Sequence, residues 1–358
     1  MPRPIRAAIS AAALSHNLAL AKAHAGSAKV WAVLKANAYG HGLERAAAAL
    51  GAADGFAVLD FEEAARLRAR GVQKPILMLE GFFQSADLAS IERHALTPVI
   101  HRAEQVEMLA RSAPSPEMDL YLKANSGMNR LGFAAASLQS AYDALRRNTR
   151  VRDITLMTHF ADADGAGGIA AQLAVFEDMV KPLGALPRSL ANSAALIRFP
   201  KESRGDWVRP GIMLYGASPF ADRSAESLGL KPVMTLSSEI IAVQRLQRGE
   251  RVGYGQAYEA SAPVTVGIVA CGYADGYPRH APSGTPVLVN GRRARTVGRV
   301  SMDMIAVDLT GHAGAGVGTP VTLWGEGLSA DEVGAAAGTI SYELFTKLTT
   351  RVPVTEVA

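Results

Sequence analysis

Residues 30–42 read VWAVLKANAYGHG, a short apolar run that ends on a lysine and is followed at once by a glycine-containing turn. The run Val30–Leu34 has the length and the β-branched content of a buried strand. Lys35 is therefore expected where that strand ends. An apolar floor removes hydration from a lysine amine, which lowers its pKa and frees it for imine chemistry. A lone lysine is more simply interpreted as a side chain that reaches from a strand end into water.

The sequence between about residues 30 and 215 alternates short apolar runs with amphipathic stretches. Strands are expected at Val30–Lys35, Phe56–Leu59, Ile76–Leu79, Thr97–Ile100, Met118–Lys123, Ile154–His159, Ser189–Asn192 and Trp207–Leu214. Helical patterns lie at Leu43–Leu50, Phe61–Arg70, Ala86–His94, Ala103–Arg111, Gln139–Arg147 and Ala171–Val180. Eight strands with intervening helices predict an α/β fold, either a (β/α)8 barrel or a doubly wound open sheet.

After Tyr215 the pattern becomes that of β structure, following an expected linker at Ser218–Leu230. Strands are expected at Val233–Gln247, Pro263–Cys271, Thr285–Val289, Arg295–Val300, Met304–Leu309 and Pro320–Trp324, and helices at Ser329–Ala336 and Ser341–Leu348. The pair Asn290-Gly291 is a hairpin signal. We therefore expect two domains, an α/β domain over residues 1–229 and a mainly β domain over residues 230–358.

Composition excludes several classes of protein. The 358 residues include 37 basic and 33 acidic ones, and the net charge of +4 is scattered, so nucleic acid binding has little support. No run approaches the roughly 18–20 apolar residues of a membrane span. The first 17 residues are interrupted by polar side chains, so no export signal is expected. A single cysteine, Cys271, excludes an intrachain disulfide and a cysteine-based zinc cluster and indicates the cytoplasm. No metal site is expected.

Polar side chains gather where the expected strands end. Lys35, Lys123, His159, Asn192-Ser193 and Arg209 all fall at or just beyond such an end. In a barrel enzyme the carboxyl ends of the strands carry the active site. On the barrel interpretation, these residues would therefore surround one site.

Eight segments carry a resemblance to a known family. They are VLKANAYGHG, MTHFADAD, LANSAA, VRPGIMLYG, VGYGQAY, GYADGYPR, GRVSMDM and ISYELFTKL, and they span residue 30 to about residue 350. They resemble the successive motifs of alanine racemase, in that family's order. The resemblance implies an N-terminal (β/α)8 barrel of the TIM type, a C-terminal mainly β domain, pyridoxal 5′-phosphate as cofactor, and a homodimer whose subunits share their active sites.

The resemblance also implies roles for the residues around the cofactor. Lys35 would bind the cofactor covalently, and Tyr39 would reach its phosphate. The phosphate site would be completed by Ser193, the backbone at Gly211 and Ile212, and Tyr342. Amides of a glycine-containing turn after the last barrel strands are suitable anion donors on physical grounds as well. Taken alone, Ser193 could equally be a helix N-cap, and Tyr39 a packed aromatic.

Arg209 and two proton carriers would set the chemistry. In the resembling family the arginine of VRPG faces the pyridine nitrogen, and because a guanidinium only donates, that nitrogen stays unprotonated. The ring is then a weaker electron sink, which suits racemisation over transamination. Lys35 would act on the D-enantiomer and Tyr254 of the other subunit on the L-enantiomer. His159, linked to Arg209, would lower the pKa of Tyr254, which alone would be a structural hairpin aromatic.

The remaining assignments concern the substrate. Arg130 would contact the cofactor's phenolic oxygen and orient the substrate carboxylate, and Lys123 matches a position where many members carry a carbamylated lysine. Tyr273, Met302 and Asp303 would line the substrate entry from the other subunit, although Asp303 could also be a turn residue.

The expected function is interconversion of L- and D-alanine, for peptidoglycan synthesis or for D-alanine catabolism. The alternatives are a broader amino-acid racemase, a decarboxylase on the same fold, and a cofactor carrier without catalysis. An acidic residue at the pyridine nitrogen would favour the decarboxylase, and Arg209 stands there instead. One departure from the family is the C-terminal sequence RVPVTEVA, which lacks the usual second basic residue and leaves the docking of the last strand open.

Overall fold

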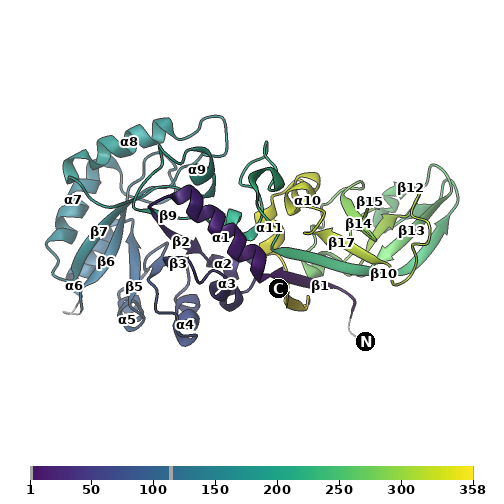
Figure 1. Cartoon of the computed structure of the whole chain (residues 1–358), viewed down its shortest axis with the longest axis horizontal. Coiled ribbons are helices and arrows are strands. Elements are labelled where there is room, and N and C mark those ends of the chain that lie inside the picture. The colour runs from purple at the N-terminus through teal and green to yellow at the C-terminus, as the bar shows by residue number, and fades with distance from the viewer. Residues whose placement is uncertain (1–2, 113–115, 358) are drawn as a thin grey trace.

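The structure, a computed structural model, describes residues 3–112 and 116–357. Two bodies lie end to end along the long axis of the molecule (Figure 1). One is a closed barrel of eight parallel strands, and the other is built on an eight-stranded, mostly antiparallel sheet. The barrel interpretation of the sequence is thus confirmed over the open sheet, as is the mainly β domain that follows it.

The barrel strands alternate with helices in the order expected of a (β/α)8 fold. The strands are β2 (Lys29–Val33), β3 (Gly55–Val58), β4 (Ile76–Met78), β5 (Leu96–Ile100), β6 (Met118–Lys123), β7 (Val151–Met157), β8 (Arg188–Ser189) and β9 (Trp207–Val208). The helices are α1 (Ala11–Ala25), α2 (Lys35–Tyr39), α3 (Leu43–Ala49), α4 (Phe61–Ala69), α5 (Leu88–Arg93), α6 (Ala103–Arg111), α7 (Ala135–Arg146), α8 (Ala170–Val180) and α9 (Ser193–Arg198). The strands β3 and β4 are buried along their whole length, which explains their continuous apolar runs.

Aromatic side chains fill the interior of the barrel. Trp31 stacks on Trp207 with ring centroids 4.2 Å apart, and its Nε1–H donates to the hydroxyl of Tyr121. Gly55 leaves room for this indole, because a Cβ there would lie 2.2 Å from Trp31 Cζ3. The barrel is therefore a packed core, and its polar side chains are left for the rim.

The second body is a sheet in the order β13-β16-β15-β14-β17-β10-β1-β18. Its strands are β1 (Arg6–Ser10), β10 (Met234–Leu246), β13 (Val264–Val269), β14 (Pro286–Val289), β15 (Arg292–Val297), β16 (Ile305–Asp308), β17 (Pro320–Trp324) and β18 (Val354–Val357). The hairpin β11 (Arg251–Val252) and β12 (Tyr258–Glu259) projects beside it, and α10 (Ala330–Ala337) and α11 (Ser341–Thr346) lie between sheet and barrel (Figure 1).

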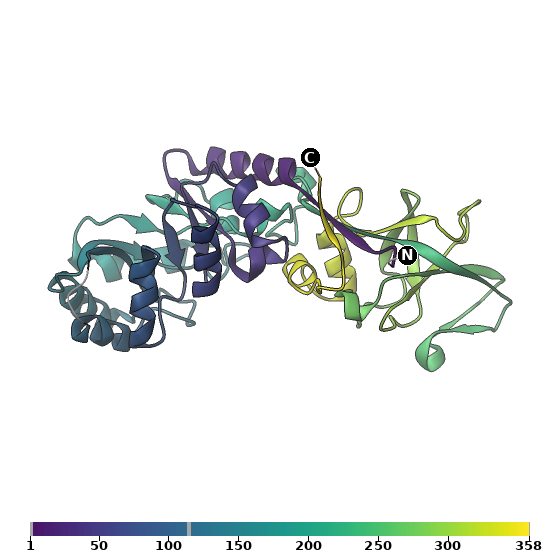
Figure 2. The same cartoon turned by 90° about the horizontal axis from the view of Figure 1, so that it is seen from below.

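One strand differs from the expected division at residue 229. Residues 6–10, assigned from sequence to the barrel domain, form β1, which pairs antiparallel with β10 and parallel with β18. Figure 2 shows β1 running from α1 into the β sheet. The first strand of the chain therefore belongs to the second body, and the barrel strands follow it in sequence. The same pairing docks the last strand, which the unusual C-terminal sequence had left open.

No helix among the described residues is both long enough and apolar enough to cross a membrane.

Candidate active site

Lys35 lies two residues beyond the end of β2, at the carboxyl rim of the barrel. Its side chain is partly buried. Burial lowers the pKa of its amine, and the positive charge of Arg130 lowers that pKa further, while Glu80 opposes both effects. The simple alternative of a lysine reaching freely into water therefore does not describe this residue. A larger fraction of free amine is available here than on an exposed lysine.

The turn after Lys35 has an unusual backbone. Ala36, Asn37, Ala38 and Tyr39 all have φ between 51° and 56°, so four successive non-glycine residues lie in the left-handed region. Each such residue costs roughly 1–2 kcal/mol, which the surroundings must offset. The Asn37 N–H donates to Glu63 Oε1 (2.8 Å), and the Asn37 Oδ1 accepts from the N–H of Leu43 (2.9 Å). This turn aims Tyr39 inward, below the rim.

Tyr39 lies between two other tyrosines. Its ring stacks on that of Tyr215 at 4.6 Å and lies 6.1 Å from that of Tyr342 on α11. Burial raises the pKa of Tyr39 and of Tyr342 well above its usual value, so both hydroxyls stay protonated donors. A Cβ on Gly211 would lie 2.4 Å from the Tyr39 hydroxyl, so that hydroxyl lies against bare backbone.

Ser193 faces the same backbone from α9. Its Oγ accepts from the N–H of Gly211 (2.9 Å) and of Met213 (3.4 Å), and the hydroxyl still carries one O–H to donate. The N-cap of α9 is Asn192, whose Oδ1 accepts from the Ala195 N–H, so the N-cap alternative for Ser193 is wrong. Tyr39, Ser193, Gly211 and the following Ile212 thus lie together.

Arg209, directly after β9, is buried beneath the rim. It donates through Nη1 to Ser189 Oγ (2.7 Å) and through Nη2 to the carbonyls of Thr158 (2.7 Å) and Leu190 (3.2 Å). These partners are neutral and the side chain is buried, so Arg209 does not act as one half of a surface ion pair. Burial lowers its pKa to about 10, which leaves the guanidinium charged at neutral pH.

Positive charge gathers around these residues. Burial lowers the pKa of Lys123, the last residue of β6, to about 8, and Arg209 and Arg130 act in the same direction. His159 Nδ1 lies 3.5 Å from Arg209 Nη2, and burial and the neighbouring cations hold the pKa of His159 well below its usual value. This rim therefore favours an anionic ligand, because such a ligand would relieve repulsion among the cations.

The predicted entry residues lie together in the other body. Tyr273 belongs to the one-turn helix η6 (Tyr273–Asp275), and its N–H donates to the carbonyl of Ser301 (3.1 Å), beside Met302 and Asp303. The Met302 side chain is 51% exposed.

Tyr254 lies in η5 (Tyr254–Gln256), the turn of the β11–β12 hairpin, and is 73% exposed. The adjoining β12 lies at the end of the molecule away from the barrel (Figure 1). A single chain therefore does not bring Tyr254 to Lys35.

Sequence reasoning assigned no role to Thr158 or Ser189, which bind the Arg209 guanidinium. Nor did it assign one to Tyr215, whose hydroxyl donates to the Val33 carbonyl beneath Lys35 (2.7 Å). Tyr215 is the second-last residue of the quoted motif VRPGIMLYG, and the apolar residues that precede it were the available signal for its burial. The contacts of Thr158 and Ser189 depend on strand pairing, which no local pattern encodes.

The chain has a closed barrel followed by a separate β domain. An amine and an anion-favouring pocket lie at the carboxyl rim of the barrel, and this arrangement is that of a two-domain barrel enzyme. Family models for the N-terminal and C-terminal domains of alanine racemase match residues 9–219 and 233–356. The alanine racemase of Thiobacillus denitrificans is 58% identical over 99% of this chain and 96% of its own. That of Nitrosospira multiformis is 55% identical over 98% and 99%.

A solved structure agrees with the sequence comparison. The biosynthetic alanine racemase of Pseudomonas aeruginosa superposes with a TM-score of 0.97 at 48% identity, covering 99% of this chain and 100% of that one. The chain belongs to the alanine racemase family, whose members are pyridoxal-phosphate-dependent isomerases. The resemblance noted from the sequence is thereby confirmed, and so is the enzyme class.

Proposed function

We propose that this enzyme racemises alanine with Lys35 and Tyr254 as its two proton carriers, in a homodimer whose subunits share their sites. The observation that carries the proposal is the partly buried Lys35 amine at the barrel rim, with its pKa lowered by burial. A free amine is what both imine formation and proton removal require.

The residues at the rim fit pyridoxal phosphate. The hydroxyls of Tyr39, Ser193 and Tyr342 and the backbone at Gly211 and Ile212 would hold the phosphate, since a Cβ at Gly211 would fill the space against the Tyr39 hydroxyl. Lys35 would bind the aldehyde. When bound, the cofactor supplies an electron-withdrawing ring that makes the Cα proton of alanine removable.

Arg209 would keep the ring of a bound cofactor a weak electron sink. Its guanidinium is fixed by three neutral acceptors and stays protonated, so it can donate to a ring nitrogen but cannot give it a proton. We infer that this disfavours protonation away from Cα and hence transamination. The decarboxylase alternative, which would need a carboxylate in this place, has no support from Arg209.

The substrate side uses Arg130 and Lys123. Arg130 would orient the substrate carboxylate, and its charge already acts on both Lys35 and Lys123. With its pKa near 8, Lys123 offers a free amine that can add to CO2 to give a carbamate and release a proton. The resulting negative charge would hold Arg130 in place.

Tyr254 must come from a second copy of the chain. It is 73% exposed, as a side chain awaiting a partner surface would be, and the exposed Met302 belongs to the same body. Lys35 would move the proton on one face of Cα, and Tyr254 on the other, with His159 as the hydrogen-bond partner of that tyrosine. The P. aeruginosa relative is described as biosynthetic, which favours a biosynthetic role here over a catabolic one. The enzyme would then work in the cytoplasm and supply D-alanine for peptidoglycan synthesis.

Borohydride reduction of the purified enzyme tests the central assignment. The pyridoxyl label should map to Lys35, and Lys35→Ala should lose the label and D-alanine formation together. Lys123 is the matched control, because it too lies at the carboxyl end of a barrel strand and burial lowers its pKa as well. A label on Lys123, or full activity without Lys35, would contradict the proposal.

A further inference from the structure

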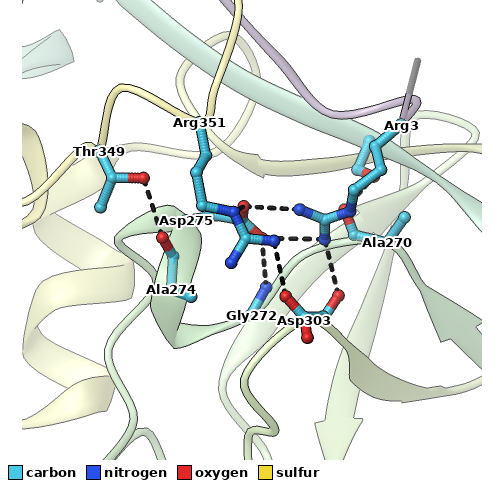
Figure 3. Close-up of polar contacts among 9 residues, drawn as sticks. Arg3, Ala270, Gly272, Ala274, Asp275, Asp303, Thr349 and Arg351 are labelled. Carbon is cyan, nitrogen blue, oxygen red and sulfur yellow. Dashed lines mark hydrogen bonds and ion pairs between the residues drawn. The ribbon is translucent and has the colours of Figure 1, made fainter.

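Two arginines from the two ends of the chain meet two aspartates of the C-terminal body (Figure 3). We call this group the terminal clamp: Arg3, Arg351, Asp275 and Asp303. Asp275 is fully buried, and its Oδ2 accepts from the N–H of Gly272 (3.0 Å). A carboxylate so far from water requires positive partners, and the clamp supplies them.

Arg3 makes the strongest contact with Asp275. Its Nη1 and Nη2 donate to Oδ1 (2.7 Å) and Oδ2 (3.0 Å), a bidentate pair. The same Nη2 donates to the backbone carbonyl of Asp303 (2.8 Å). One guanidinium therefore ties η6 to the loop that carries Met302 and Asp303.

Arg351 completes the clamp from the segment before β18. Its Nη2 donates to Asp303 Oδ1 (2.6 Å), and its Nε lies 3.5 Å from Asp275 Oδ1. The Asp303 side chain is about half exposed, so Arg351 binds it at the edge of the clamp that meets solvent. Its carboxylate is thereby oriented toward the protein.

The clamped loops have little freedom to shift. The N–H of Tyr273 and that of Ala274 donate to the carbonyls of Ser301 (3.1 Å) and Met302 (3.0 Å). A Cβ at Gly272 would lie 2.3 Å from the Met302 carbonyl oxygen. Whatever orients one loop therefore orients the other, and both carry residues assigned to the substrate entry.

We propose that Arg3 and Arg351 are positioning residues for the substrate entry, and that Arg351 in particular neutralises Asp303 so that the entry accepts a substrate carboxylate. This inference rests on the proposed function and on the expectation from the family resemblance that Tyr273, Met302 and Asp303 line the substrate entry. Without Arg351, an unpaired Asp303 carboxylate faces the path and repels the incoming carboxylate. The effect falls on substrate capture and is screened by salt.

Steady-state kinetics of Arg351→Gln test the proposal. We expect KM for L-alanine to rise about three- to fivefold, the range of an exposed ion pair, while kcat changes less. Added salt should reduce the rise. The second substitution in Arg351→Gln/Asp303→Asn should bring KM back toward the wild-type value, because it removes the repelling charge.

Arg293→Gln is the matched control, since it breaks an exposed arginine–carboxylate pair with Glu332 in the same body, away from the clamp. Thermal unfolding of each variant separates misfolding from a kinetic effect. A fall in kcat at unchanged KM, or a KM that the second substitution leaves raised, would overturn the inference.

The Arg3 arm provides an independent measurement. Arg3→Gln removes the bidentate contact but leaves the Arg351–Asp303 pair, so its KM increase should be nearly independent of salt, and Arg3→Lys should recover part of it. A wild-type enzyme that does not racemise alanine would refute the proposed function instead, so the two failures are distinguishable.

Discussion

The Arg209 guanidinium has a structural role beside the chemical role proposed for it. It satisfies the Ser189 hydroxyl and the carbonyls of Thr158 and Leu190 at once. A lysine has a single donor centre and cannot reach all three, so Arg209→Lys should lower the free energy of unfolding by about 1–3 kcal/mol. On the proposed function we also expect more pyruvate per racemisation event, because the ring nitrogen of a bound cofactor would lose its fixed donor. Chemical unfolding and a pyruvate assay measure the two effects.

The neighbouring Arg188 provides the control for that substitution. Its Nη1 pairs with Glu177 Oε1 at 2.6 Å near the surface, so Arg188→Lys should change stability by less than about 0.5 kcal/mol and leave the pyruvate ratio unchanged. Equal losses of stability in the two variants would show that the buried contacts of Arg209 are not special.

Lys123 makes stability depend on pH. Because its pKa falls from 10.5 to about 8 on folding, the unfolded chain binds an extra proton between those values and stability rises with pH there. Below pH 8 Lys123 is protonated in both states, and burying its ammonium lowers the free energy of unfolding by about 3 kcal/mol. Lys123→Met should therefore be more stable than wild type at pH 7, with a smaller advantage at pH 9.5.

Urea unfolding of cofactor-free protein in CO2-free buffer measures this advantage. The exposed Lys201 supplies the control. The difference in free energy of unfolding between Lys201→Met and wild type should be the same at both pH values. Bicarbonate should stabilise the wild type alone if Lys123 forms a carbamate. An advantage of Lys123→Met that is the same at both pH values would exclude a buried ammonium as its cause.

Helices and strands were predictable where apolar residues recur with a clear spacing along the sequence. The bounds of β6 and α6 agree with those expected from sequence, because an apolar run closed by Lys123 marks the strand and a clear amphipathic pattern marks the helix. The shortest strands were overestimated. β9 was expected to extend to residue 214, but it ends at Val208, and the apolar residues beyond it form the buried turn η3 (Ile212–Tyr215). Apolar runs report burial, and they do not separate strand from buried turn.

The N-terminal elements were missed for a different reason. α1 is rich in alanine and has little contrast between its faces, although Ser10 caps it by accepting from the Ala13 N–H (3.0 Å). β1 pairs with strands more than two hundred residues away. Likewise, sequence placed polar residues at the rim but could not predict which acceptors bind Arg209. Contacts between residues far apart in the sequence determine both the pairing of β1 and the acceptors of Arg209, and a local sequence pattern does not predict such contacts.

The left-handed turn α2 predicts an inverted response to glycine. Ala36 is exposed with φ 56°, a conformation that costs alanine roughly 1–2 kcal/mol and glycine little. Ala36→Gly should therefore leave stability unchanged or raise it by up to about 1 kcal/mol. The exposed Ala174 in the middle of α8 should behave oppositely, with Ala174→Gly losing about 1 kcal/mol. Equal losses at both sites, measured by thermal unfolding, would argue against the left-handed geometry.

The two bodies are joined at the candidate phosphate site. Tyr342 on α11 lies beside Tyr39, and a Cβ at Gly40 would lie 2.1 Å from the carbonyl oxygen of Phe345 on the same helix. Asn17 of α1 also accepts from the Lys231 N–H (2.9 Å) at the start of the C-terminal body. The relative position of the bodies is therefore fixed close to Lys35, while the β11–β12 hairpin with Tyr254 extends away from it.

That arrangement makes complementation between chains a decisive experiment. Lys35→Ala and Tyr254→Phe should each be inactive as pure dimers. In a heterodimer of the two variants, one shared site carries both substitutions and the other site carries neither. Statistical mixing makes about half of the dimers heterodimers, so about a quarter of wild-type activity should return. Lys35→Ala mixed with Arg130→Ala is the control, because both residues come from one barrel and no heterodimer site is intact. Recovery in the control, or none in the first mixture, would show that Tyr254 does not act across the dimer.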